Sequence, residues 1–235
     1  MKSERENDKG EPNVDQLKDL DLNTLSTFGS VIDLEPDMKL IVTGSYATEA
    51  LTEVSAEHED MDTNIFCLDI EQQKNKVASL IEELSIPNVS ITLFREKEDR
   101  LAYDIQTGQH EPRRLEIQFV EVTEIDEDSD SFQLKSGGIV PTSIMLIKDS
   151  KGEESKFRVK SLPYAIATWV IRTSGVAENA KRPVRESDYT QLMQLLSRNY
   201  SDDEVFMLMA QHPQMPAEMS AETVFTELMK KLKGK

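Results

Sequence analysis

The chain has 235 residues, of which 38% are hydrophobic and 30% charged, and its formal net charge is −17 at pH 7. This length allows a sizeable hydrophobic core, so one domain, or a domain with a helical appendage, is expected. The acidic excess argues against binding of long duplex nucleic acid, which usually needs a basic stripe to neutralise phosphates. No run of about 18 uncharged apolar residues is present, so neither a membrane span nor a membrane partner is expected.

The N-terminal residues are polar and charged, without the apolar segment of a secretory signal. Residues 1–16 are expected to form a disordered polar tail, because they contain almost no apolar residue that a core could bury. The single cysteine, Cys67, lies in an apolar segment and has no partner for an intramolecular disulfide. These features favour a cytoplasmic location.

A strand–turn–helix–strand unit is predicted between residues 40 and 68. The apolar run Leu40–Val42 predicts a central strand, and the following Gly44 and Ser45 predict a sharp turn. Ser45 can cap a helix over Tyr46–Leu51 with its hydroxyl facing a phosphate, although an ordinary strand–turn–helix junction explains the same pair. A second strand is predicted to begin at Asp60.

The remaining elements are predicted from hydrophobic periodicity and turn residues. Helices are expected over 14–28, 72–84, 162–172 and 189–196, with two more after residue 202. Strands are expected over 89–94, 101–105, 114–120, 139–140, 144–147 and 157–159, with a charged turn or short helix over 95–100. The pattern predicts an α+β fold, in which a mixed sheet with flanking helices (17–160) precedes a C-terminal helical region (161–235).

Two acidic residues at the start of the second strand are candidate metal ligands. Residues two apart on a strand point to the same face, so Asp60 and Asp62 project together, with Asn64 next on that face. Adjacent carboxylates repel one another, and a divalent cation between them relieves the repulsion. The pair therefore predicts a magnesium site suited to phosphoryl transfer. His58 is interpreted as an exposed turn residue in preference to a metal ligand.

The glycine–serine turn and the following D-x-D resemble the first motif of the nucleotidyltransferase superfamily. More narrowly, residues 40–196 resemble the AbiEii-type nucleotidyltransferases, many of which are toxins of bacterial toxin–antitoxin pairs. The resemblance implies a two-metal Mg²⁺ enzyme that moves a nucleoside monophosphate from a nucleoside triphosphate to a hydroxyl acceptor, either an RNA end or a protein. It also implies an antitoxin or another protein as a partner.

The resemblance also implies roles for single residues. Asp60 and Asp62 would hold the metal ions, and Gly44 and Ser45 would cradle the triphosphate. Glu116, on the strand over 114–120, would be the third metal-binding carboxylate; the family more often has Asp there, and a solvent-facing glutamate is the alternative interpretation. Asp104 and Glu121 are weaker candidates for the same role.

Basic residues near the C-terminal helices would neutralise the nucleotide phosphates. The family commonly carries a lysine in the helix over 162–172, where this chain has Trp169; Arg172, three residues on, is a candidate substitute. Lys181, Arg182 and Arg185 could neutralise the same charge. The family motif also implies that Asp188 lines the nucleotide pocket or orients a basic side chain, whereas capping of the next helix by Ser187 or Asp188 explains it structurally.

Two alternatives to the enzyme remain at this stage. A catalytically inactive protein of the same fold could act as a protein-binding module, since the expected lysine is absent. An unrelated α+β protein with an accidental D-x-D is the other alternative, because short motifs match by chance. The intact Asp60/Asp62 pair favours the enzyme, since no structural need for two carboxylates is evident at that point.

Overall fold

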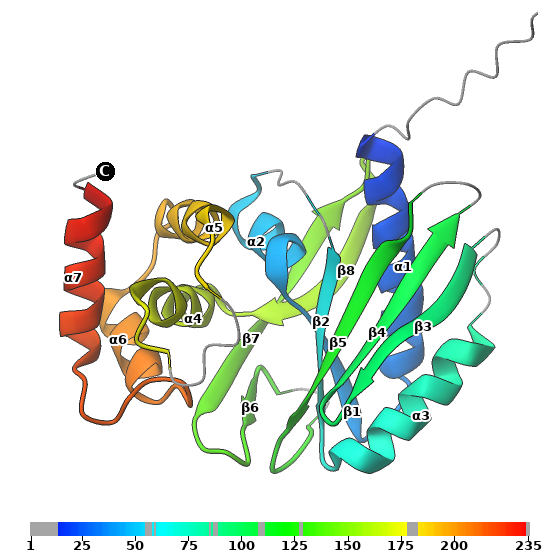
Figure 1. Cartoon of the computed structure of the whole chain (residues 1–235), viewed down its shortest axis with the longest axis horizontal. Coiled ribbons are helices and arrows are strands. Elements are labelled where there is room, and N and C mark those ends of the chain that lie inside the picture. Colours follow the sequence, from blue (N-terminus) through cyan, green and yellow to red (C-terminus); the bar gives the residue numbers. More distant parts are fainter. Residues whose placement is uncertain are drawn as a thin grey trace, which may run out of the picture.

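The computed structural model describes residues 14–54, 58, 60–84, 86, 89–107, 111–126, 129–177 and 183–233. These residues form an α+β fold with one mixed sheet (Figure 1). The strands are β1 (Met38–Val42), β2 (Asp60–Cys67), β3 (Val89–Lys97), β4 (Arg100–Thr107), β5 (Arg113–Glu121), β6 (Ser131–Gln133), β7 (Ile139–Lys148) and β8 (Glu154–Lys160). The helices are α1 (Val14–Ile32), α2 (Gly44–Thr52), α3 (Ile70–Glu83), α4 (Leu162–Ser174), α5 (Glu186–Leu196), α6 (Asp202–Ala210) and α7 (Ala221–Lys233).

The sheet has the strand order β3-β4-β5-β2-β1-β8-β7-β6. Its centre is mixed, because β1 pairs antiparallel with β2 and parallel with β8, while β2 pairs parallel with β5. Every residue of β1 is buried, as expected of a central strand covered on both faces. Outer hairpins extend the sheet on both sides, β3–β4 next to β5 and β6–β7 next to β8.

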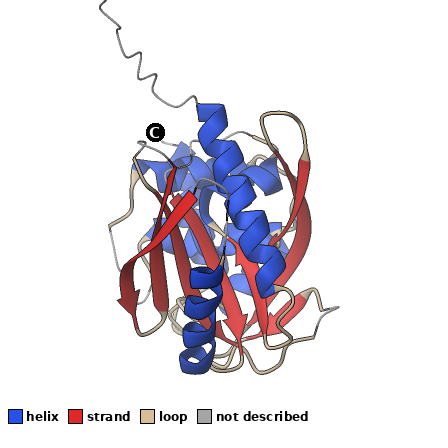
Figure 2. Cartoon of the chain, turned by 90° about the vertical axis from the view of Figure 1, so that its right-hand side faces the viewer, coloured by secondary structure: helices blue, strands red, loops and turns tan. Residues whose placement is uncertain are grey.

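Two hydrophobic cores lie on opposite faces of the sheet. One core joins α1 and α3 to the sheet and contains Phe28, Val77 and Ile65; Figure 2 shows both helices in front of the strands. The other core joins the C-terminal helices α4–α7 to the opposite face and contains Phe66 and Val170. Successive residues on β2, such as Ile65 and Phe66, therefore enter different cores, which is the period-two alternation of a strand buried on both faces.

The structure follows the predicted elements, with differences at several of them. The strand expected over 89–94 continues to Lys97, so residues 95–97 are strand and the turn is confined to residues 98–99. The strand expected over 101–105 is β4, which lies inside the sheet between β3 and β5. The two segments expected over 139–147 form the single strand β7, which continues through Pro141. The three-residue strand β6 was not predicted. Helix α5 begins three residues before the expected start at residue 189.

At the N-terminus, the predicted disordered tail lies outside the described residues up to residue 13, and α1 already begins at Val14. The boundary predicted at residue 160 coincides with the last residue of β8, but the domain division itself stays a prediction. Among the helices that the structure describes, none has the length and apolar content needed to cross a membrane.

Candidate active site

The sheet brings the three predicted metal-binding carboxylates to one face. β2 begins at Asp60, as predicted, and the parallel pairing of β2 with β5 sets Asp62 directly opposite Glu116. Paired residues on neighbouring strands project to the same face, and Asp60 lies two residues before Asp62 on that face. Asp60, Asp62 and Glu116 therefore lie together beside the second core, at the ends of β2 and β5 where each strand begins.

The carboxyl of Asp62 is electrostatically perturbed by its surroundings. Burial raises the pKa of its carboxyl, and the negative charges of Glu116 and Asp60 raise it further, to about 6. The positive charges of Arg172 and Arg100 oppose this shift only in part. The site therefore has an excess of negative charge that a bound cation would relieve.

The chemistry of this donor set fits Mg²⁺, which prefers carboxylate oxygens. In the described part of the chain, no group of three His, Cys, Asp or Glu side chains converges closely enough to enclose a metal ion as it stands. Carboxylates without a cation between them repel one another, so a loose arrangement is expected before a metal binds.

The turn after β1 places the start of α2 against Asp62. The Thr43 N–H donates a hydrogen bond to the Asp62 carbonyl oxygen at 2.9 Å. Gly44 follows with φ +65°, and a Cβ atom at Gly44 would lie only 2.4 Å from Asp62 Oδ2. Glycine is thus required here by both the backbone conformation and the contact. The first N–H groups of α2 have no partners within the helix, so this end can bind an anion next to the carboxylates.

Ser45 is the second residue of α2, whose N-cap is Thr43, so the prediction that Ser45 caps this helix is wrong. Its side chain instead lies in a partly buried hydrogen-bonded chain. Its Oγ is 2.8 Å from His58 Nδ1, and His58 Nε2 is 2.8 Å from Glu49 Oε2. The His58 side chain is only 6% exposed, so its interpretation as an exposed turn residue is wrong. The sequence held one signal for this contact, since Ser45 and Glu49 are four residues apart and share one face of a helix.

Arg172 and Asp188 form an ion pair beside the carboxylates. Arg172 Nε lies 3.5 Å from Asp188 Oδ2, and the Arg172 charge acts to lower the pKa of Asp62. Trp169 is half-buried against the second core, and the Arg172 guanidinium lies 5.2 Å from the centre of its ring. Arg172 therefore supplies a positive charge next to the carboxylates from the helix in which the family's lysine is expected.

Asp188 makes both contacts that the sequence analysis left open, one that caps a helix and one that orients a basic side chain. It is the third residue of α5 and is 1% exposed, and its Oδ2 accepts a hydrogen bond from the Arg185 N–H at 2.9 Å. The same carboxylate pairs with Arg172, so it both caps the helix and orients a basic side chain. Ser187 is exposed and is not the cap.

The other predicted candidates have separate places. Arg185 is exposed at the start of α5, and residues 181 and 182 lie outside the described residues. Asp104 pairs with Arg114 at 2.9 Å, and Glu121 lies at the opposite end of β5, opposite Cys67. Neither Asp104 nor Glu121 therefore takes the position beside Asp62 that Glu116 occupies.

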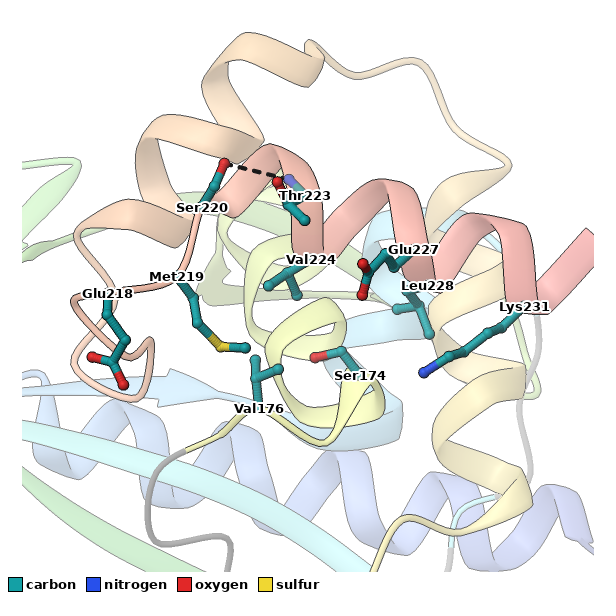
Figure 3. Close-up of a pocket in the computed structure, with 10 residues that line it drawn as sticks. All are labelled: Ser174, Val176, Glu218, Met219, Ser220, Thr223, Val224, Glu227, Leu228 and Lys231. Carbon is teal, nitrogen blue, oxygen red and sulfur yellow. Dashed lines mark hydrogen bonds between the residues drawn. The ribbon is translucent and has the colours of Figure 1, made fainter.

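A separate pocket of about 400 Å³ lies in the C-terminal helical region (Figure 3). Its lining includes Ser174 at the end of α4, Met219 before α7, and Thr223 and Lys231 on α7. None of the predicted site residues that the structure describes lines it. The candidate active site is therefore the carboxylate face of β2 and β5, with the start of α2 and Arg172 beside it.

The fold is that of nucleotidyltransferases, as solved structures show. The antigenic nucleotidyltransferase-like protein from Paracoccidioides brasiliensis aligns with a TM-score of 0.55 and 13% sequence identity, over 91% of this chain and 88% of that protein. MenT4, a nucleotidyltransferase toxin from Mycobacterium tuberculosis H37Rv, aligns with a TM-score of 0.57 and 15% identity, over 83% of this chain and 63% of that protein. No protein-family profile and no curated protein sequence matches the chain. At these identities the likeness shows the fold alone, and the predicted α+β nucleotidyltransferase fold is confirmed.

Proposed function

We propose that the protein is a Mg²⁺-dependent nucleotidyltransferase that moves a nucleoside monophosphate from a nucleoside triphosphate to a hydroxyl acceptor. The observation that carries the proposal is the meeting of Asp60, Asp62 and Glu116 on one sheet face, directly against the start of α2 at Gly44. A cluster of carboxylates in which burial and two neighbouring carboxylates raise the pKa of Asp62 lies beside a helix N-terminus. Such a site suits a metal–triphosphate complex, because the carboxylates bind the cation and the helix N-terminus binds the phosphates.

In this proposal Asp60, Asp62 and Glu116 would hold two Mg²⁺ ions. The chemistry that Mg²⁺ supplies at such a site is activation of the attacking hydroxyl and neutralisation of the departing pyrophosphate. The chain's own residues bind and orient the nucleotide. The N–H groups at the start of α2 bind phosphate oxygens, and Arg172, oriented by Asp188, contributes positive charge to the triphosphate.

The face of β3, β4 and β5 next to Glu116 favours an RNA end as the acceptor. Arg95 on β3 pairs with Ala102 on β4, which in turn pairs with Glu116 on β5. The strand register therefore places Arg95 on the same face as Glu116. The same register places Lys97 and Arg100 next to each other, in line with Gln118. These three cations form a local concentration of positive charge in a protein whose net charge is −17.

Phe94 and Arg114 add an aromatic surface to these cations. The Phe94 side chain lies on the edge strand β3 with 46% of its surface exposed. The Arg114 guanidinium lies 3.6 Å from the centre of the Phe94 ring. Exposed aromatic rings beside arginines bind unpaired bases by stacking. We name this surface, formed by Phe94, Arg95, Lys97, Arg100 and Arg114, the basic strip.

Nucleotide binding is the first test. Thermal shift would be measured with each nucleoside triphosphate, with and without Mg²⁺, on the wild type and on Asp60→Ala/Asp62→Ala. A bound ligand raises the apparent stability by mass action, so the proposal expects a Mg²⁺-dependent rise that the double variant lacks. The absence of a rise with every nucleotide would instead favour a catalytically inactive, protein-binding module.

Acceptor binding is tested separately with a short single-stranded RNA, by fluorescence anisotropy. Phe94→Ala is expected to weaken RNA binding about fivefold or more, because stacking on one aromatic ring contributes roughly 1–3 kcal/mol. Ile144→Ala, which truncates a similarly exposed residue on the distant strand β7, is the matched control. Nucleotide binding without RNA binding would make a protein the acceptor.

The likeness to MenT4 supports, as part of the same proposal, a role as the toxin of a toxin–antitoxin pair with an antitoxin partner. Induced expression of the wild type in a bacterial host is then expected to arrest growth. Asp60→Ala/Asp62→Ala is expected to leave growth normal at an equal protein level. Equal growth of both cultures would remove the toxin role without affecting the proposed chemistry.

A further inference from the structure

A continuous chain of four side chains connects α2 to α1 through His58. Ser45 Oγ contacts His58 Nδ1, and His58 Nε2 contacts Glu49 Oε2, both at 2.8 Å. The other carboxylate oxygen of Glu49 accepts a hydrogen bond from Lys18 Nζ at 2.5 Å. Glu49 is 8% exposed, so its charge lies in a protected environment where these hydrogen bonds are strong.

The His58 ring is also held by contacts on other sides. It stacks on the fully buried Tyr46 ring, with 3.6 Å between the centroids and 3° between the planes. The Tyr46 hydroxyl donates to the buried carboxylate of Asp21 at 2.7 Å, and Arg113 Nη2 lies 2.6 Å from the same carboxylate. Arg113 Nη2 also donates to the His58 carbonyl oxygen at 2.6 Å. Both the backbone and the ring of His58 are therefore fixed.

The donors and acceptors along this chain follow from the chemistry of its members. The Lys18 ammonium favours the ionised form of Glu49, and an ionised carboxylate can only accept hydrogen bonds. His58 Nε2 is then the donor to Glu49, and in the neutral ring Nδ1 is the acceptor for the Ser45 hydroxyl. In this tautomer the Ser45 hydroxyl donates to the imidazole and is not available as a phosphate donor. The phosphate donors of this turn are then the backbone N–H groups of α2.

The chain ends next to both halves of the candidate site. Ser45 follows Gly44, which lies against Asp62, and His58 precedes Asp60 by two residues. Fixing His58 therefore fixes Ser45, and with it the N–H groups of the phosphate-binding turn, relative to the strand that carries the carboxylates. Holding a binding group in one orientation before the ligand arrives raises affinity, because less freedom is lost on binding.

We propose that His58 is a positioning residue for nucleotide binding: through its contact with the Ser45 hydroxyl it holds the first turn of α2, with its phosphate-binding N–H groups, in one orientation, and it is itself held by Glu49 and Lys18. The inference rests on the proposed function, because it assigns the nucleotide triphosphate to the start of α2. His58 acts through Ser45, and no contact between His58 and the nucleotide is required.

Two conservative variants separate this role from the tethering of the His58 backbone by Arg113. In His58→Asn the amide can replace Nδ1 and accept from Ser45, whereas in His58→Gln the longer amide replaces Nε2 and keeps only the Glu49 contact. Titration calorimetry with the nucleotide and Mg²⁺ is expected to give near wild-type affinity for His58→Asn and about tenfold weaker binding for His58→Gln. The reverse order, or equal affinity for both variants, would overturn the positioning role.

A double-mutant cycle with Ser45→Ala supplies an independent readout that loss of folding cannot imitate. Ser45→Ala is expected to weaken nucleotide binding about tenfold in the wild type and to add almost nothing in His58→Gln, because the same interaction is already lost. Additive losses would overturn the inference. A wild type that binds no nucleotide refutes the proposed function and this inference together, whereas a wild type that binds as well as every variant refutes this inference alone.

Discussion

Replacement of Asp62 by asparagine is expected to stabilise the metal-free protein. The pKa of the Asp62 carboxyl is raised from 3.8 to about 6 by burial and by the charges of Glu116 and Asp60. One pKa unit corresponds to about 1.36 kcal/mol, so ionised Asp62 lowers the free energy of unfolding by about 3 kcal/mol at neutral pH. Asparagine keeps the shape of the side chain and removes the charge. The gain in stability is the expected consequence of replacing a residue whose charge serves binding and not folding.

The pH dependence of this gain has a defined sign. A raised carboxyl pKa means that the folded protein binds the proton more tightly than the unfolded chain, so the destabilisation is absent below pH 3.8 and complete above about pH 6. Urea unfolding in a chelating buffer is therefore expected to show the full gain for Asp62→Asn at about pH 7.5 and roughly half of it at about pH 5. Glu124→Gln, which neutralises an exposed carboxylate in a loop, is the matched control and is expected to show no gain.

Two results would refute this reasoning. If Asp62→Asn were no more stable than the wild type at neutral pH, burial and the neighbouring carboxylates would not disfavour the charge of Asp62 as its position implies. If the gain were equal at both pH values, its cause would not be the charge of Asp62. Added Mg²⁺ gives a further check, because a cation that relieves the repulsion should stabilise the wild type more than Asp62→Asn.

Three further changes test other parts of the site. Gly44→Ala is expected to lower the free energy of unfolding by at least about 1–2 kcal/mol, since φ at Gly44 is +65° and the new Cβ would meet Asp62 Oδ2. The same variant is expected to abolish the thermal shift with nucleotide. Asp21→Ala is expected to destabilise the protein by about 3–5 kcal/mol in urea unfolding, because it leaves the charge of Arg113 without its fully buried partner; a loss below 1 kcal/mol would contradict this. Arg172→Gln is expected to weaken nucleotide binding in calorimetry at least tenfold, because it removes the positive charge beside Asp62. Arg172→Lys is expected to keep most of the affinity. Equal loss of affinity in both variants would show that the geometry of the arginine side chain, and not its charge, matters.

The sequence by itself determined the local unit that contains the site. An apolar run, a glycine, a helix and a D-x-D at the start of the next strand were all visible in it, and the structure has β1, α2 and β2 at these positions. The period of a strand places Asp60 and Asp62 on one face without any knowledge of the fold. The sequence shows that residue 44 is a glycine, but it does not show the contact with Asp62 that requires a glycine there.

Only the tertiary structure decided which distant residues meet at this unit. Glu116 and Asp104 are both acidic residues on strands, and the parallel register of β2 with β5 alone places Glu116 opposite Asp62. His58 contacts Tyr46 and Arg113, which come from separate elements, and its partner Glu49 is held by Lys18 from a third element. Strand order, register and burial of a turn arise from contacts between residues far apart in the chain, and local periodicity contains no information about them. The roles of the site residues stay predictions that the nucleotide and RNA binding experiments test.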